Sequence, residues 1–322
     1  MQFTSLFLFI SLLMISTDLT TTEVPNASIS NGVITANLYL PDIEKGYYRS
    51  TRFDWSGVIS KLEYKGHNYF GQWFDNYTPK KHDAICGPVD EFGAVGYENV
   101  KIGETFLKIG VGMLKKSTDD SYNSFSYYDI ENSGERFIKQ VDNAIEFVHL
   151  LTDISGYACE YRKVVTLTPG KPELVISYKL KNTGRKGIKT TVYNHNFFTI
   201  DNQHTGPDII IKFPFKINGE GEGIGDIAQI INDKIIFLKP LEKTDRVYMG
   251  NIVGFDKAKS DHSFCIMNNR TGAGVKLNCN QPLARLVFWA YCTTSCPEPY
   301  ISINVKPMQE FAWENRYEFF TF

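Results

Sequence analysis

Three short segments of the chain carry side chains that could transfer protons. The first is Tyr193–Phe198, where His195 lies between Asn194 and Asn196 and among aromatic residues. An imidazole, with an unperturbed pKa of about 6.5, is a natural proton donor or acceptor near neutral pH. A histidine in such a setting is, however, more often a satisfied core or surface residue than a catalyst.

The second segment, residues 80–93, contains His82, Asp83, Asp90 and Glu91 in a stretch punctuated by glycine and proline. A loop of this kind lets carboxylates and an imidazole converge without the spacing that a strand imposes. The alternative interpretation is a solvated turn.

The third segment places Glu298 between Pro297 and Pro299, immediately before a terminal strand. Because proline restricts the backbone, the carboxylate is held more firmly than it would be on a flexible loop. A fixed carboxylate is suited to general base catalysis. A plain turn is the alternative.

The elements that position these residues are predicted to be strands. In residues 173–181, apolar and polar residues alternate with a period of two, as expected for an antiparallel strand with one buried face. Asn31-Gly32 and Lys65-Gly66 each separate two such runs and predict hairpin turns. Helical periodicity is scarce, and only residues 225–231 suggest a short helix. The pattern predicts an all-β protein, a large antiparallel two-sheet β-sandwich.

Composition agrees with a folded β protein and argues against a polyanionic partner. The 322 residues include 34 Lys or Arg and 36 Asp or Glu, so the formal net charge is −2. Without a field of one sign, nucleic acid binding is not expected. Aromatic residues make up 14% of the chain, which favours half-buried pleated surfaces.

Residues 1–22 are predicted to be a signal peptide and spacer, followed by one domain over residues 23–322. The apolar run Leu6–Ile15 is too short to cross a bilayer of about 30 Å. A buried N-terminal strand or a membrane anchor is the alternative. We expect a secreted, periplasmic or cell-surface protein with no membrane span after removal of the signal.

The six cysteines lack the paired spacing with histidines that a structural zinc site needs, so no metal is expected. A hairpin centred near Gly272 would place Cys265 opposite Cys279 and allow a disulfide. Cys292 and Cys296 are close enough in sequence to staple a loop. In each case, two ordinary buried thiols are the alternative.

The chain resembles the aldose 1-epimerase (galactose mutarotase) family over most of its length after about Ile29. Tyr193–Phe198 is similar to the family's Asn-His-x-Tyr/Phe-Phe segment, and Val305–Phe319 is similar to its closing strand pair. Together with Arg52–Gly57 and Gly87–Phe92, these segments resemble a poorly characterised mutarotase-like branch. The resemblance implies a galactose-mutarotase-like supersandwich.

This resemblance also implies an activity: a monosaccharide or sugar derivative is bound in a shallow cleft, and its anomers are interconverted without a cofactor. A carboxylate takes the proton of the anomeric hydroxyl while a histidine protonates the ring oxygen. His195 matches the acid histidine, and Glu298 is the nearest candidate for the base, with Glu91 as the alternative. We expect the Glu298 carboxyl to face His195 across a sugar-sized gap. The substrate-binding candidates are Arg52, His82, Glu91 and Asp208.

Two further interpretations compete with an anomer-converting enzyme. A carbohydrate-binding β-sandwich could have kept the cleft and lost the chemistry, because folds host many functions. An accessory domain of a polysaccharide lyase or hydrolase is disfavoured, since the chain contains no partner catalytic domain.

Overall fold

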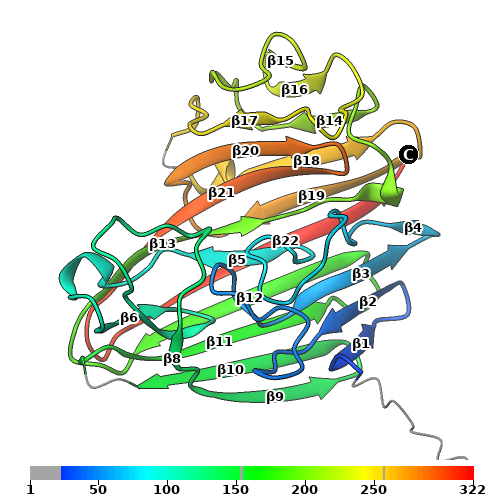
Figure 1. The fold of residues 1–322 in the computed structure, drawn as a ribbon. Helices are drawn as coiled ribbons and strands as arrows, with labels where there is room; N and C mark the ends of the chain where they lie inside the picture. Colours follow the sequence, from blue (N-terminus) through cyan, green and yellow to red (C-terminus); the bar gives the residue numbers. More distant parts are fainter. Residues whose placement is uncertain (1–22, 153–154, 257) are drawn as a thin grey trace, which may run out of the picture.

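The structure is a computed structural model that describes residues 23–152, 155–256 and 258–322. Strands dominate this part of the chain, and all of the paired strands are antiparallel (Figure 1). The predicted large antiparallel β-sandwich is therefore confirmed. Within the described residues, helix is limited to three single turns: η1 (Tyr97–Asn99), η2 (Ile200–Asn202) and η3 (Lys259–Asp261).

One layer of the sandwich is a single curved sheet, here named the large sheet. Its strands in spatial order are β15 (Ala228–Ile231), β16 (Lys234–Phe237), β14 (Ile209–Lys212), β18 (Ser263–Asn268), β19 (Ala273–Cys279), β22 (Glu310–Thr321), β12 (Glu173–Asn182), β11 (Ala158–Leu167), β10 (Ala144–Thr152) and β9 (Glu135–Val141).

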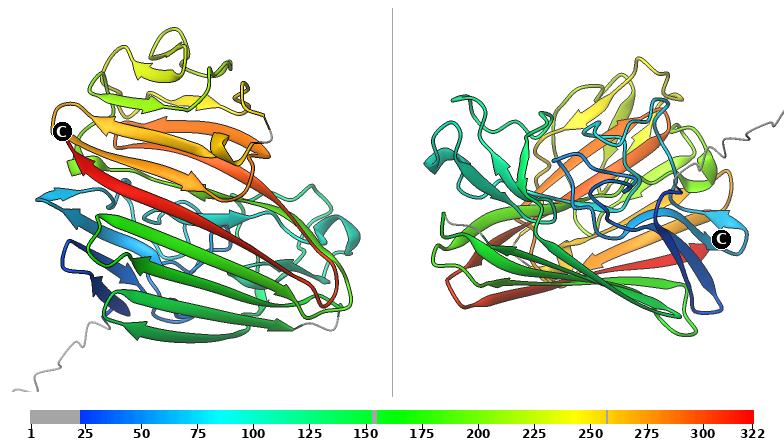
Figure 2. Two further views of the ribbon diagram at one scale, coloured as in Figure 1. Left: turned by 180° about the vertical axis from the view of Figure 1, so that it is seen from behind. Right: turned by 60° about the horizontal axis from the view of Figure 1, so that its bottom comes forward.

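The facing layer is divided into smaller sheets, which lie above the large sheet in the right-hand view of Figure 2. The site sheet has the order β17 (Val247–Met249), β20 (Arg285–Tyr291), β21 (Thr294–Val305), β13 (Ile188–His195) and β5 (Val89–Phe92). The N-terminal sheet consists of β1 (Asn26–Ser30), β2 (Ile34–Tyr39), β3 (Val58–Tyr64) and β4 (His67–Asn68). The small sheet consists of β6 (Thr105–Lys108), β7 (Gly112–Lys115) and β8 (Ile130–Asn132).

The alternation read from the sequence determines which face of each strand is buried. In β12, Leu174, Ile176, Tyr178 and Leu180 are buried, whereas Lys179 is exposed. These side chains join one apolar core cluster, to which all four sheets contribute. The two predicted hairpin turns are also present, with Gly32 and Gly66 both in the left-handed conformation that glycine tolerates.

A buried ion cluster lies between the large sheet and the site sheet. Lys163 of β11 is fully buried, and its Nζ lies 2.7 Å from Asp90 Oδ2 and 3.4 Å from Asp54 Oδ2. The Lys163 ammonium also donates to the carbonyl of Ser56 at 2.8 Å. Burial lowers the pKa of Lys163, but attraction to Asp90 and Asp54 outweighs it, and the pKa is raised. The cluster thus links β11 to β5 through opposite charges.

One expected element is wrong. Residues 225–231, predicted to form a short helix, contain strand β15 at the edge of the large sheet. Ala228 is buried there, and β15 pairs with β16 from Ala228↔Phe237 to Ile231↔Lys234. Tertiary pairing has therefore overridden the weak local preference.

The predicted Cys265–Cys279 disulfide is also wrong, because the hairpin is centred earlier than expected. Gly272 occupies the last turn position, at φ 73°, and the pairing begins at Asn268↔Ala273. Cys265 consequently lies opposite Lys276, and Cys279 lies three positions further on. Cys279 is buried while Cys265 is partly exposed, so the two thiols occupy opposite faces of the sheet.

The second predicted bridge, Cys292–Cys296, is contradicted as well. Both thiols are free and buried, and they belong to different apolar clusters on the two sides of the site sheet. Cys292 lies in the two-residue turn between β20 and β21, whereas Cys296 pairs with Trp289 inside the ladder. Ordinary buried thiols are therefore the correct interpretation for this pair.

The predicted signal peptide and spacer, residues 1–22, lie outside the described residues and stay a prediction. Among the residues that the structure does describe, no helix has the length and apolar character needed to cross a membrane.

Removal of the buried ammonium should weaken the fold. Lys163→Met leaves Asp54 and Asp90 buried without a counter-charge, and we expect the free energy of unfolding to fall by about 3–5 kcal/mol. Urea denaturation measures this change. The matched control is Lys179→Met on neighbouring β12, whose side chain is 46% exposed and should matter by no more than about 1 kcal/mol. Equal losses in the two variants would contradict the role given to the cluster.

The thiol assignment can be checked by mass. The protein, unfolded without reductant and treated with iodoacetamide, should take up label at all six cysteines, because the register keeps the predicted partners apart. A peptide that contains Cys265 bonded to Cys279 would show that the register in solution differs.

Candidate active site

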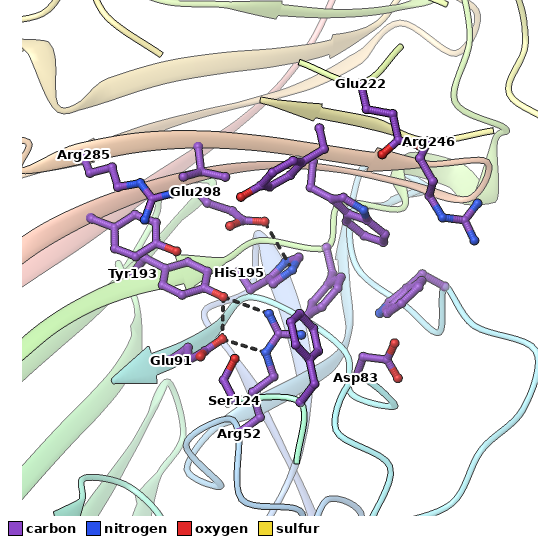
Figure 3. A pocket seen from close by; sticks show the side chains of 17 residues that line it. Arg52, Asp83, Glu91, Ser124, Tyr193, His195, Glu222, Arg246, Arg285 and Glu298 are labelled. Carbon is purple, nitrogen blue, oxygen red and sulfur yellow. Dashed lines mark hydrogen bonds and ion pairs between the residues drawn. The ribbon is translucent and has the colours of Figure 1, made fainter. Parts of the chain in front are cut away.

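A cleft of about 600 Å³ lies on the outer face of the site sheet, on the side away from the large sheet. Every strand of the site sheet contributes at least one side chain to the cleft. Where one strand contributes two, they are two residues apart, because such residues share a face of the sheet. Tyr193 and His195 of β13 illustrate this spacing (Figure 3), as do Glu298 and Tyr300 of β21.

The residues between these positions point the opposite way, into the sandwich. Asn194 donates to Asp90 Oδ1 at 2.6 Å, and Asn315 of the large sheet donates to the side-chain oxygen Oδ1 of Asn194. Asn196 donates to the carbonyl of Pro297 at 2.7 Å. The asparagines that flank His195 are thus structural groups that hold β13 in place.

His195 and Glu298 are in direct contact. His195 Nε2 lies 3.3 Å from Glu298 Oε1, and the two residues are 4% and 6% exposed. The structure therefore brings together the two residues that the sequence singled out, but it corrects their expected separation, because no sugar-sized gap lies between them. Glu298 also lies inside β21 rather than at the entrance of the strand.

Burial shifts the pKa values of His195 and Glu298 in opposite directions, so that near neutral pH both side chains are uncharged. Desolvation, assisted by the charge of Arg52, lowers the pKa of His195 well below its usual value. Desolvation raises the pKa of Glu298 to about 8. Near pH 7, Glu298 is therefore a carboxylic acid and His195 a neutral imidazole, which reverses the protonation implied by the family resemblance.

Aromatic rings fix the orientation of the imidazole. The ring of His195 stacks on Phe197 with a centroid separation of 3.7 Å and an angle of 7° between the planes. Trp289 of β20 meets the imidazole edge-on at 5.7 Å. Phe197 has a φ of 37°, an uncommon conformation for a bulky residue, and it coincides with this stacking. His195 Nδ1 is buried and has no hydrogen-bond partner among the described residues.

A second charged group, formed by Arg52, Glu91 and Tyr193, lies beside the pair. Arg52 Nε donates to Glu91 Oε2 at 2.7 Å, and Arg52 Nη2 donates to the Tyr193 hydroxyl at 3.0 Å. The Tyr193 hydroxyl in turn donates to Glu91 Oε2 at 2.6 Å. The guanidinium also lies over the ring of Phe125, at 4.6 Å. Arg52 and Glu91, both predicted as binding residues, do line the cleft.

This arrangement leaves Glu91 unsuited to be the base. Burial raises its pKa, but Arg52, Lys108 and the Tyr193 hydroxyl outweigh burial, and the pKa is lowered. A carboxylate that is stabilised in its charged form and already accepts two hydrogen bonds is a weak proton acceptor. Glu298, whose pKa is raised, is the better placed acid/base group.

Two predicted binding residues do not line the cleft. His82 contacts Phe125 edge-on at 5.1 Å and lies 3.4 Å from Asp83, and it is Asp83 rather than His82 that faces the cavity. Asp208 forms a surface ion pair with Arg270 at 2.8 Å, away from the cleft. The assignment of Asp208 as a binding residue is therefore wrong.

Sequence reasoning missed several residues of the cleft, which come from distant segments: Trp73, Phe125, Glu222, Arg246, Arg285 and Trp289. Only β20 carried a usable signal, because Arg285, Val287 and Trp289 share one face by their spacing of two. Among the described residues, no three His, Cys, Asp or Glu side chains converge in a way that could hold a metal ion.

Solved structures of similar fold cover nearly the whole chain. A galactose mutarotase-like protein from Clostridium acetobutylicum has a TM-score of 0.57 and 12% identity, with 92% of this chain and 95% of that chain covered. An aldose epimerase homologue from C. elegans has a TM-score of 0.54 and 10% identity, with 93% of this chain and 99% of that chain covered. A galactose mutarotase related enzyme from Lactobacillus acidophilus has a TM-score of 0.53 and 10% identity, with 92% of this chain and 97% of that chain covered.

The likeness is confined to structure. No family model matches the sequence, and no curated protein matches it significantly. At identities of 10–12%, these comparisons establish the fold. The chain therefore has the β-sandwich fold of galactose mutarotase-like proteins.

The raised pKa of Glu298 has a consequence for stability. A group with a raised folded pKa contributes stability that is present below its unfolded pKa, near 4.5, and is lost as pH rises toward about 8. Glu298→Gln has no such loss, so we expect it to exceed the parent in unfolding free energy by about 3 kcal/mol at pH 7, and by almost nothing at pH 4. Urea denaturation at both pH values measures this.

The matched control is Glu135→Gln, which alters an exposed carboxylate of β9 and should change stability by less than about 0.5 kcal/mol at either pH. Equal stability of Glu298→Gln and the parent at pH 7 would mean that Glu298 is ionised in the folded protein.

Proposed function

We propose that the protein is an aldose 1-epimerase-like enzyme that interconverts the anomers of a free sugar or sugar derivative. The observation that carries the proposal is the buried contact of 3.3 Å between His195 and Glu298 in a cleft lined by aromatic and charged side chains. The fold shared with mutarotase-like proteins supports it.

Direct contact between the two groups suits this reaction. The anomeric hydroxyl and the ring oxygen are bonded to the same carbon, so they lie only two bonds apart. An acid and a base in contact can therefore reach both oxygens from one side of the sugar, and no gap between His195 and Glu298 is needed.

Ring opening can be written with one proton on the pair. The Glu298 carboxylic acid protonates the ring oxygen as the C1–O5 bond breaks, and His195 takes the proton of the anomeric hydroxyl as the C1=O1 bond forms. The products are a carboxylate and an imidazolium in contact, which are the protonation states that the reverse steps need. Rotation about C1–C2 and reclosure by the reverse steps give the other anomer.

The remaining residues of the cleft supply binding. Trp73 and Trp289 present apolar rings for the faces of a sugar, and aromatic residues with a few fixed polar groups are typical of small-molecule sites. Arg285 is held by the carbonyl of Gly250, to which its Nε and Nη2 donate at 2.9 and 2.6 Å. Its position beside Glu298 favours a role in binding sugar hydroxyls.

A non-catalytic carbohydrate-binding β-sandwich is the second candidate. One observation favours it: His195 and Glu298 expose only 4% and 6% of their surface, which restricts the contact that a substrate can make with them. If the protein is an enzyme, substitution of His195 or Glu298 lowers the rate of anomer conversion. If it is a binding module, the parent converts no sugar and the substitutions can affect only sugar binding.

Polarimetry of freshly dissolved α-glucose, α-galactose and a panel of deoxy and acidic sugars tests the enzyme. We expect His195→Ala and Glu298→Gln each to lower the mutarotation rate by about 10²–10⁴-fold, because each removes one of two proton-transferring groups. Sugar binding, followed by calorimetry, should persist in Glu298→Gln, since the amide keeps the shape of the carboxyl.

The matched control is Asp208→Asn, which lies outside the cleft and should keep the parent rate. Full activity of His195→Ala on a sugar that the parent converts would refute its assignment. A parent protein that binds sugars but converts none would establish the binding module instead.

A further inference from the structure

A second hollow of about 240 Å³ adjoins the cleft on the side away from Arg285. The two cavities share four lining residues: Trp73, Asp83, Arg246 and Trp289. Figure 3 shows Asp83 and Arg246 at this side of the site, beyond the His195–Glu298 pair. The cavities are therefore neighbouring parts of one continuous depression.

Two aromatic rings of β20 run from the first cavity into the second. Trp289 and Tyr291 share one face of the strand, so their Cα atoms span about 7 Å at roughly 3.3 Å per residue. Val287 lies opposite Glu298 in the ladder and lines only the cleft, whereas Tyr291 lines only the hollow. Trp289 lines both cavities.

The rings along this surface are held in place. Those of Trp289 and Tyr291 are 14° from parallel, with centroids 6.3 Å apart. Trp73 meets both edge-on, at 5.3 and 6.2 Å, and the Arg246 guanidinium lies 4.0 Å from the Tyr291 ring. The two rings therefore offer adjacent, preorganised stacking surfaces, one at the junction of the cavities and one in the hollow.

The polar groups around the hollow suit hydroxyls rather than an anion. Its two cations are already engaged. Arg246 donates to the carbonyls of Lys243 and Asp245 at 2.9 and 2.6 Å, and Lys81 Nζ forms an ion pair with Asp83 Oδ1 at 3.8 Å. Asp83 Oδ1 is buried at the boundary of the two cavities and has no hydrogen-bond partner among the described residues. An unsatisfied buried acceptor of this kind calls for a donor such as a sugar hydroxyl.

We propose that the hollow is a second sugar subsite and that the substrate class is a neutral reducing oligosaccharide of two or more residues. The reducing-end ring occupies the cleft at His195 and Glu298, and the next ring occupies the hollow against Trp289 and Tyr291, within reach of Asp83. This proposal rests on the proposed function, because it takes the reducing end to lie at the acid/base pair.

Calorimetry with lactose, cellobiose and maltose, each compared with glucose, tests the subsite. We expect at least one disaccharide to bind the parent about tenfold or more tightly than glucose. Tyr291→Ala should remove most of this preference and leave glucose binding unchanged, because Tyr291 lines only the hollow. Asn76→Ala, an exposed change in the same hollow, should lower the preference less, by about 2–3-fold.

The matched control is Tyr248→Ala. Tyr248 is an exposed tyrosine that lines the cleft but not the hollow, so this change should weaken glucose and disaccharide alike and preserve their ratio. Equal affinities of the parent for glucose and all three disaccharides would overturn the subsite. A preference that neither Tyr291→Ala nor Asn76→Ala reduces would also overturn it.

Polarimetry on the same sugars separates this inference from the proposed function. A disaccharide preference without anomer conversion of any sugar would leave the subsite standing and refute the catalytic assignment. Anomer conversion of glucose and disaccharides with equal kcat/KM and equal affinity would leave the enzyme standing and refute the subsite.

Discussion

The buried ammonium of Lys163 is the interaction on which the geometry of the site depends. It lies between Asp90 of β5 and Asp54 of the loop that joins β2 to β3, and it projects from the inner face of the large sheet. Since neighbouring residues on a strand face opposite ways, the contact that holds Asp90 inside the sandwich also directs Glu91 outward into the cleft. A slip of one residue would exchange the two carboxylates, leaving Lys163 without this partner.

A second group of charged residues lies on the cleft side of the site sheet, outside the Lys163 cluster, and it influences the pKa values of the residues in the cleft. Arg52, Glu91 and Tyr193 satisfy one another, so Arg52 acts as a fixed positive charge that opposes protonation of His195. Glu298, in the same cleft, remains protonated because burial outweighs the attraction of Arg52. The site therefore combines the Arg52–Glu91 pair, which stays charged, with the His195–Glu298 pair, which is neutral and can exchange a proton. Only the second pair has the properties that acid/base chemistry requires.

The shape of the depression complements this chemistry. The neutral pair lies at one end, under rings that exclude water from the imidazole, and β20 carries the aromatic surface away from it toward the hollow at Asp83. A site limited to one ring in the cleft would gain nothing from Tyr291, which lines only the hollow. The proposed reaction uses residues of β13 and β21, whereas the proposed subsite uses residues of β20, and so substitutions can separate them.

The sequence by itself determined the strands, most of their buried faces and the two residues at the centre of the site. Alternation in β12, the turn glycines and the motifs around His195 and Glu298 are local signals, and local signals survive in a linear chain. Only the tertiary structure shows that Lys163 pairs with Asp90 and that the turn position keeps Cys265 and Cys279 apart. It also shows that Asp208 lies on the surface, outside the site. It also decided the contact of His195 with Glu298 and the protonation that burial gives them. These features depend on register and on desolvation by segments far apart in the chain, which no residue spacing encodes.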